Sequence, residues 1–199
     1  MTVRAVVVAD RDGRTAGEVA DAPDPEAGVG EVLLEVDLSS LNYKDAMAVA
    51  GRPGILRGLP KTAGIDAVGR LPDGRSVVVT GAGLGERRDG GLAERVAVDP
   101  AWIVEVPMPF TPQHAAAIGT AGVTAALSVL RLQRLAPPPG PVLVTGAGGG
   151  VGGFAVALLA ASGFEVVAST GRTEQLGDHL RGLGASDVVP RLDAEPGRP

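Results

Sequence analysis

The sequence contains no cysteine and only two histidines, His114 and His179. Disulfide bonds and zinc sites built from cysteine are therefore excluded. A catalytic zinc held by histidine and carboxylate groups would need ligands that the sequence hardly offers. We predict that both histidines are ordinary surface or helix residues and that the protein uses no metal.

Long apolar runs and an excess of positive charge are also missing. The longest apolar run, Phe154 to Ala161, is far shorter than the roughly 20 residues of a membrane-spanning helix. The formal net charge is −5, which argues against binding to nucleic acid or to anionic membranes. The N-terminus "MTVRAVVVADRDG" lacks the layout of a signal peptide, because acidic residues follow its short apolar stretch at once. We predict a cytoplasmic protein without nucleic-acid or membrane partners.

The first part of the chain consists of short β segments separated by turns rich in Gly, Pro and Asp. The segments Arg4–Ala9, Val32–Leu38, Arg75–Thr80 and Leu92–Val98 have the composition of strands. Many short strands with little helix predict a compact domain that is mostly antiparallel or barrel-like, and we place it at residues 1–110.

The pattern changes after residue 110. Gln113–Leu132 has apolar residues at helical spacing, with a break at Gly119–Gly122, and "APPPGP" ends this helix because proline cannot continue it. The strand "PVLVTGA", an apolar helix at Phe154–Ser162, the strand "FEVVAST", a helix closed by Gly184 and the strand "SDVVP" follow. This alternation predicts an α/β domain with a doubly wound parallel sheet at residues 111–199. The tail "RLDAEPGRP" shows no periodicity, and we expect it to lack regular structure.

The stretch "VLVTGAGGGVGGFA" lies between a predicted strand and a predicted helix. Gly148, Gly150 and Gly153 satisfy the fingerprint G-x-G-x-x-G, and Ala147 with the last two glycines satisfies A-x-x-G-x-x-G. Small residues let the backbone approach a pyrophosphate, and the helix directs its first N–H groups at that anion. We therefore predict a dinucleotide cradle, the alternative being a glycine-rich turn without a ligand. The loop of short-chain dehydrogenases also matches, but that class needs a tyrosine downstream, and the only tyrosine is Tyr43.

The end of the second predicted strand bears on which dinucleotide binds. NAD sites usually carry an acidic residue there that binds the ribose 2′-hydroxyl. This strand ends "ASTGRTEQ", with Ser169, Thr170 and Arg172 ahead of the first acidic residue, Glu174. Hydroxyl groups and a guanidinium suit a 2′-phosphate, so the sequence favours NADPH over NADH. The alternative is that Arg172 is a solvated loop charge.

Several stretches, in order along almost the whole chain, carry a family resemblance. They are "SSLNYKDAMAVAG", "GIDAVG", "GGLAERVAV", "IGTAGVTAALSV", "VLVTGAGGGVGG" and "LRGLGASDVVPR". The sequence resembles the medium-chain dehydrogenase/reductase superfamily, in its zinc-independent quinone-oxidoreductase branch, and looks most like acryloyl-CoA reductase. The resemblance implies an N-terminal GroES-like β-barrel domain followed by a partial Rossmann domain.

The resemblance also implies an activity, which is hydride transfer from NADPH to an activated C=C bond of a small molecule. The substrate would be an enoyl thioester such as acryloyl-CoA, an enone or a quinone. Asn42 and Asp45 match an element that lies beside the nicotinamide in this branch, with Tyr43 as a candidate acid and Lys44 as a candidate stabiliser of a developing enolate. The alternative is a strand-to-helix turn in which Asn42 caps the helix.

Cofactor-binding residues follow from the glycine loop, the second strand and a threonine that approaches the nicotinamide side in relatives. They are Thr120, Thr145, Ala147, Gly148, Gly149, Gly150, Val151, Gly152, Gly153, Ser169, Thr170 and Arg172. Members of this family are longer, with further strands in the cofactor sheet, and relatives often dimerise. We therefore expect the 199-residue chain to be a poor enzyme by itself. The alternative function is a non-catalytic dinucleotide-binding remnant that needs a partner chain.

Overall fold

A computed structural model of the protein describes residues 1–136 and 138–192. The chain divides into two compact units, Met1–Thr120 and a second unit that begins at Ala121. The boundary that the sequence predicts between residues 110 and 111 stays a prediction. The tail from residue 193 onward, which is predicted to lack regular structure, lies outside the described residues.

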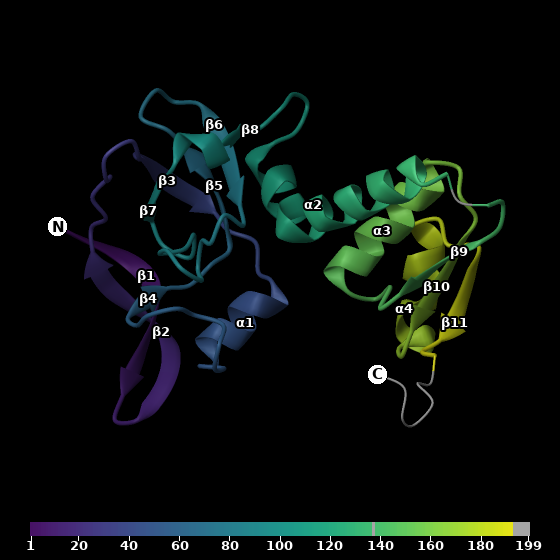
Figure 1. Cartoon of the computed structure of the whole chain (residues 1–199), viewed down its shortest axis with the longest axis horizontal. Helices are drawn as coiled ribbons and strands as arrows, with labels where there is room; N and C mark the ends of the chain where they lie inside the picture. The colour runs from purple at the N-terminus through teal and green to yellow at the C-terminus, as the bar shows by residue number, and fades with distance from the viewer. Residues whose placement is uncertain (137, 193–199) are drawn as a thin grey trace. The chain divides into compact units, whose positions relative to one another are not determined.

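Two antiparallel sheets form the first unit, with the strand orders β2-β1-β4 and β7-β3-β5-β6-β8 (Figure 1). Helix α1 (Tyr43–Val49) follows β3, and a 3-10 turn (Pro100–Trp102) precedes β8. The strands are β1 (Thr2–Arg11), β2 (Arg14–Pro23), β3 (Val32–Leu38), β4 (Lys61–Thr62), β5 (Asp66–Arg70), β6 (Ser76–Thr80), β7 (Arg95–Val98) and β8 (Val104–Glu105). The predicted antiparallel β domain is confirmed.

The core of the first unit forms because alternate residues of each strand point to the same face. Val77 and Val79 of β6 and Val96 and Val98 of β7 are buried, and they pack with Leu34 of β3 in one cluster. Burying such a side chain contributes about 1.5 to 3 kcal/mol. This cluster joins strands β3, β5, β6 and β7, and it thereby positions the first residue of β5, which belongs to the site described below.

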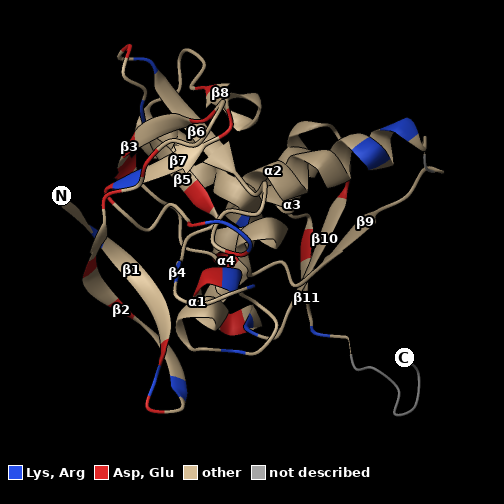
Figure 2. Ribbon diagram, turned by 60° about the vertical axis from the view of Figure 1, so that its left-hand side comes forward, with Lys and Arg blue, Asp and Glu red and all other residues tan. Residues whose placement is uncertain are grey.

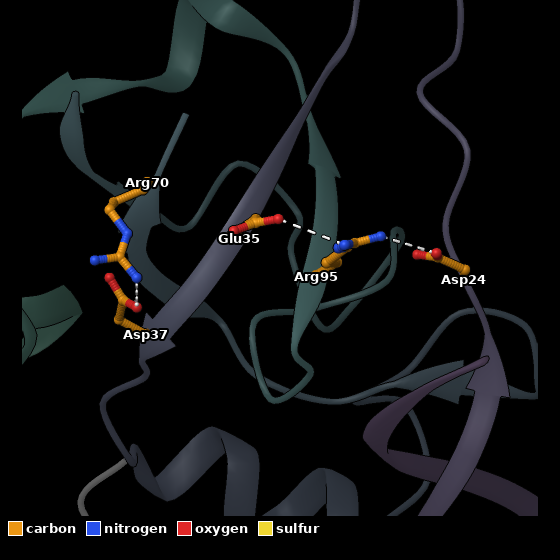
Figure 3. Close-up of polar contacts among 5 residues, drawn as sticks. All are labelled: Asp24, Glu35, Asp37, Arg70 and Arg95. Carbon is orange, nitrogen blue, oxygen red and sulfur yellow. Dashed lines mark hydrogen bonds and ion pairs between the residues drawn. The ribbon is translucent and has the colours of Figure 1, made fainter. Parts of the chain in front are cut away.

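The other face of this sheet carries charged side chains (Figure 3). Arg95 Nη2 lies 3.4 Å from Glu35 Oε1, and Arg95 Nη1 lies 2.9 Å from Asp24 Oδ2. Arg70 Nη2 lies 2.8 Å from Asp37 Oδ1. The Arg70–Asp37 pair is exposed, and such a pair contributes about 1 kcal/mol or less, so a substitution at Asp37 changes charge with little effect on the fold.

The second unit contains a parallel sheet of order β11-β10-β9 (Figure 1). Its strands are β9 (Val142–Thr145), β10 (Val166–Thr170) and β11 (Asp187–Pro190), joined by α3 (Gly150–Ala161) and α4 (Thr173–Gly182). Helix α3 packs against β9 and β10, and α4 packs against β10 and β11. The predicted β-α-β-α-β order is confirmed. Since the strands are parallel, their carboxyl ends share one edge of the sheet.

Helix α3 begins earlier than the sequence predicts. The predicted start was Phe154, whereas the helix starts at Gly150. Glycine is a poor helix former, so the composition of this segment is typical of a loop. Tertiary contacts of the glycines with the loop before them, described below, account for the difference.

Helix α2 (Pro112–Arg134) is long and apolar enough to cross a membrane by length and composition alone. It contains no charged residue before Arg131 and Arg134 in its last turn (Figure 2). Ala125 and Val129 are nevertheless buried, and Val129 belongs to the hydrophobic cluster of the second unit. This is a core helix. It has non-helical angles at Gly119 (φ 42°, ψ −155°), inside the predicted break.

Candidate functional site

The glycine-rich loop joins β9 to α3 at the carboxyl edge of the parallel sheet. Gly146 has a φ of 62°, a conformation that favours glycine. The N–H of Ala147 donates to Ser169 O at 3.0 Å, which holds the loop against β10. Gly149 is the N-cap of α3, so the helix begins inside the run of glycines.

Close packing requires glycine at position 152. A Cβ on Gly152 would lie 2.4 Å from Gly146 O and 2.7 Å from Ala147 Cα. Both are backbone atoms, so no side-chain rotation can relieve the clash. On Gly153 the nearest atom would be Leu183 Cδ1 at 3.7 Å, an ordinary contact. The close approach of helix to loop therefore occurs at Gly152 and not at Gly153, the last glycine of the sequence fingerprint.

Gly148 lies beside the connection between β10 and α4. A Cβ there would be 2.5 Å from Leu176 Cδ1 and 3.0 Å from Thr170 Oγ1. Arg172 Nη2 donates to Gly148 O at 3.0 Å. The loop is thus fastened to this connection, and the Arg172 guanidinium lies over the loop.

The first turn of α3 offers backbone donors to an anion. The bond from Gly153 N–H to Gly149 O, at 2.8 Å, closes the first turn. The N–H groups of residues 150–152 come before it and have no intrahelical acceptor. Val151 is 42% exposed, so its side chain does not fill the turn. A helix N-terminus of this kind favours an anion, because its N–H groups and its dipole both interact well with negative charge, and the binding of a pyrophosphate here stays a prediction.

A cavity of about 440 Å³ lies at this loop. Six of the predicted cofactor-binding residues line it, namely Thr145, Gly148, Gly149, Ser169, Thr170 and Arg172. Its remaining lining residues, which the sequence interpretation missed, are Gly146, Gly171, Arg191 and Leu192. Arg191 directly follows β11, so the parallel sheet brings a second guanidinium to the cavity. The order of the strands, with β10 and β11 as neighbours, is the signal that could have found it.

The two predicted hydroxyl groups have partners inside the second unit. Ser169 is 2% exposed, and its Oγ donates to Pro190 O at 3.0 Å. Thr170 is 6% exposed, and its Oγ1 accepts from the N–H of Arg172 at 3.3 Å. The Ser169 hydroxyl hydrogen is therefore used to join β10 to β11. Arg172 and Arg191 are the positively charged residues that line the cavity.

The predicted catalytic segment lies in the first unit, where Asn42 is the N-cap of α1. The N–H of Asn42 donates to Asp45 Oδ2 at 2.8 Å, and the N–H of Ile65 donates to Asp45 Oδ1 at 2.9 Å. Asp45 is 2% exposed. Both of its carboxylate oxygens thus accept backbone N–H groups, which stabilises the start of α1. A catalytic role for Asp45 stays a prediction.

Tyr43 and Lys44 lie in the first turn of α1. Tyr43 is 81% exposed. Lys44 Nζ lies 2.5 Å from Glu86 Oε2. The hydrogen bond and the charge of Lys44 hold the pKa of Glu86 below its usual value. The ammonium of Lys44 therefore already has a partner, and its predicted role at a substrate requires an exchange of that partner.

The structure brings Asn42 and Thr120 together through Asp66, to which the sequence interpretation gave no role. Asn42 Nδ2 donates to Asp66 Oδ2 at 2.8 Å. The N–H of Thr120 donates to Oδ2 at 3.0 Å, and Thr120 Oγ1 lies 2.6 Å from Oδ1. Ser40 Oγ lies 2.5 Å from Oδ2. Asp66 is fully buried. A single charged residue in the apolar stretch "GIDAVG" was the available signal.

Both histidines are exposed, His114 on α2 and His179 on α4. Within residues 1–136 and 138–192, no three His, Cys, Asp or Glu residues gather in a way that could hold a metal ion.

Known proteins are similar to this chain over nearly its whole length, although no family model matches the sequence. The "Probable acrylyl-CoA reductase AcuI" of Escherichia coli (strain K12) is 41% identical over 207 residues, which cover 99% of this chain and 64% of the relative. The crystal structure of the YhdH oxidoreductase from Salmonella enterica in complex with NADP aligns with a TM-score of 0.88 at 39% identity, over 98% of this chain and 64% of that chain. The crystal structure of Bacillus subtilis protein YhfP with NAD bound aligns with a TM-score of 0.87 at 40% identity, over 96% of this chain and 60% of that chain.

The two kinds of sheet, the glycine loop and these relatives define the class of protein. The chain belongs to the medium-chain dehydrogenase/reductase superfamily, in which GroES-like antiparallel sheets are followed by a parallel sheet with helices. Within that superfamily it belongs with AcuI, YhdH and YhfP in the quinone-oxidoreductase-like group, and the family predicted from the sequence is confirmed. The chain spans 64% of the length of the AcuI and YhdH proteins.

Proposed function

We propose that the protein is an NADPH-dependent reductase that transfers a hydride to an activated C=C bond, as in acryloyl-CoA, another enoyl thioester or an enone, or to a quinone. The observation that carries the proposal is the cavity at the glycine loop, with Arg172 and Arg191 in its wall. The relatives support it, since one is named as an acrylyl-CoA reductase and the structure of another holds NADP.

The residues at the cavity fit a 2′-phosphorylated dinucleotide. Residues 149–151 at the start of α3 are exposed, and the first N–H groups of this helix would hold the pyrophosphate. Arg172 and Arg191 would hold the 2′-phosphate, because guanidinium groups bind phosphate through charge-assisted hydrogen bonds. The first acidic residue after β10 is Glu174 on α4. Among residues 138–192, no carboxylate therefore takes the place at the strand end where one would bind an unphosphorylated ribose.

The residues of the first unit fit the chemistry of alkene reduction. When bound, the reduced nicotinamide supplies the hydride for the β-carbon of the substrate. The α-carbon then needs a proton, and the exposed phenol of Tyr43 would donate it from Oη. Lys44 would leave its partner Glu86 and donate a hydrogen bond to the substrate carbonyl, which polarises that carbonyl. Asn42 and Thr120 would contact the nicotinamide, held by the hydrogen bonds described above.

Binding and turnover measured in one sample test this function. The full chain is titrated with NADPH and with NADH by calorimetry, and NADPH oxidation is then followed with acryloyl-CoA and with a quinone. The reductase predicts tighter binding of NADPH and substrate-dependent oxidation, however slow, that Tyr43→Phe reduces. Asp37→Asn, which changes only an exposed ion pair, is the control and should match the wild type.

A second function, non-catalytic binding of the dinucleotide with a partner chain, is favoured by the contacts of the predicted catalytic segment. Lys44 is paired with Glu86, and both carboxylate oxygens of Asp45 accept backbone N–H groups. Binding of NADPH without oxidation of either substrate would support this function and count against the reductase. Absence of binding would refute both.

A further inference from the structure

We propose that Asp24 and the cavity beside it bind a small organic cation, which carries a primary ammonium on an aliphatic body. The cavity has a volume of about 320 Å³. All of its lining residues belong to the unit Met1–Thr120, so the site does not depend on the proposed coenzyme function. Asp24 lines the cavity directly after the end of β2. The ligand would therefore be a second small molecule, distinct from the coenzyme.

The Asp24 carboxylate has one oxygen without a partner. Its Oδ2 accepts from Arg95 Nη1 at 2.9 Å (Figure 3). Its Oδ1 is buried and accepts no hydrogen bond from residues 1–136 or 138–192. The adjacent residues Pro23 and Pro25 carry no backbone N–H, so neither neighbour can supply the hydrogen. Because a buried carboxylate oxygen is costly unless a donor satisfies it, Asp24 favours a ligand that brings an N–H group.

The charges around Asp24 favour an ammonium over a neutral donor. Arg95 also contacts Glu35, with its Nη2 3.4 Å from Oε1 (Figure 3). One guanidinium between two carboxylates leaves one negative charge uncompensated. The other charged residues of the cavity wall are Lys61 and Asp89, whose charges cancel. A cation at Asp24 would therefore satisfy both Oδ1 and the excess charge, whereas an alcohol would satisfy only Oδ1.

The ammonium of Lys61 is a competitor within the chain, because Lys61 and Asp24 line the same cavity. Its Nζ donates instead to Arg87 O at 3.4 Å. Since Lys61 repels a second cation, Lys61→Met should raise the affinity for an ammonium ligand. A lower affinity in this variant would contradict a ligand that lies at Asp24.

The rest of the cavity wall suits an aliphatic body. Val3, Ala5 and Val7 are alternate residues of β1, so their side chains point to the same face of the strand. All three line the cavity together with Ala22 of β2, which pairs with Val3. A hydrocarbon chain gains free energy when it leaves water for such a surface. The cavity thus joins a negative pole to an apolar wall, and a bare metal ion would match only the first.

Three ligands of equal chain length test the proposal, namely hexylammonium, 1-hexanol and hexanoate. Each is titrated into the full 199-residue chain near neutral pH by calorimetry. Because a charge-assisted hydrogen bond is stronger than a neutral one, the wild type should bind hexylammonium about tenfold more tightly than 1-hexanol. Hexanoate, which brings a negative charge beside Asp24, should bind more weakly than the alcohol. In Asp24→Asn the preference for the ammonium over the alcohol should fall to about twofold or less.

Asp12→Asn is the matched control. It makes the same change of charge in the exposed turn at the other end of the β1–β2 hairpin, and asparagine tolerates the positive φ of 53° found there. This variant should keep the wild-type preference. A folded Asp24→Asn that also keeps that preference would overturn the proposal, as would a wild-type chain that binds hexylammonium no more tightly than 1-hexanol.

If Asp24→Asn does not fold, Ala22→Leu decides. The larger side chain fills part of the cavity and leaves Asp24 in place, so it should weaken the binding of hexylammonium and of 1-hexanol alike, by about tenfold. Unchanged binding of both ligands overturns the proposal. None of these titrations contains NADPH, so the proposed function stands or fails separately.

Discussion

Two neighbouring glycines of α3 should respond to the same substitution in opposite directions. In Gly152→Ala the new methyl group would lie 2.4 Å from Gly146 O and 2.7 Å from Ala147 Cα. In Gly153→Ala it would meet nothing closer than Leu183 Cδ1, at 3.7 Å. Both changes add the same atoms to the same turn of helix, so each is a matched control for the other.

The magnitudes follow from packing and helix propensity. Overpacking against rigid backbone costs about 2 to 3 kcal/mol, and replacing glycine by alanine within a helix returns about 1 kcal/mol. Gly152→Ala should therefore lose about 1 to 2 kcal/mol of unfolding free energy, whereas Gly153→Ala should gain up to about 1 kcal/mol. For a chain of this size these values correspond to a Tm lower by about 2 to 8 °C and higher by about 2 to 4 °C.

Differential scanning calorimetry of the full chain measures both shifts, and a titration with NADPH accompanies each melt. Gly152→Ala should also weaken NADPH binding, because the clash displaces the first turn of α3 from the loop. Gly153→Ala should bind as the wild type does. A Gly152→Ala chain as stable as Gly153→Ala would refute the close approach of helix and loop on which the cradle depends.

Three further predictions concern charged side chains. Removing either guanidinium, in Arg172→Ala or Arg191→Ala, should raise the Kd for NADPH about tenfold or more and change the Kd for NADH less than about twofold, as calorimetric titrations would measure. Lys44→Met should lower the Tm near neutral pH. Lys44 depresses the pKa of Glu86, so its contribution to stability is complete above the ordinary value of 4.5 and is lost as the pH falls through the depressed pKa. The difference in Tm between Lys44→Met and the wild type should therefore shrink as the melts are taken to lower pH. Asp45→Ala leaves two backbone N–H groups without their acceptor and should cost about 2 to 4 kcal/mol, so lost activity in that variant marks catalysis only if its melting curve is unchanged.

The sequence predicts the second unit well because its elements follow one another along the chain. Each strand and helix from Val142 to Pro190 meets its neighbour through a short connection, and local patterns suffice. The first unit is harder. Strand β2 was missed because none of its residues is buried and its stability comes from backbone pairing with β1. Asp12-Gly13, both with positive φ (53° and 77°), form the tight turn between these strands, and that dipeptide is a hairpin signal.

The candidate site likewise has residues that the sequence predicts and residues that only the tertiary structure shows. The glycine loop and Arg172 were predicted from a short stretch of sequence. The hydrogen bonds of Asp66 were not, because its partners Ser40, Asn42 and Thr120 lie 26, 24 and 54 residues away and only the tertiary fold brings them together. Arg191 was missed for the same reason, since its place in the cavity depends on β11 lying beside β10.

The central claim is that the second unit cradles a 2′-phosphorylated dinucleotide. Isothermal titration calorimetry of the full 199-residue chain with NADPH and with NADH tests it most directly. The account predicts saturable binding of NADPH, about tenfold or more tighter than that of NADH, because two arginines would meet the 2′-phosphate. Equal affinity for the two coenzymes, or no binding of NADPH, would contradict it.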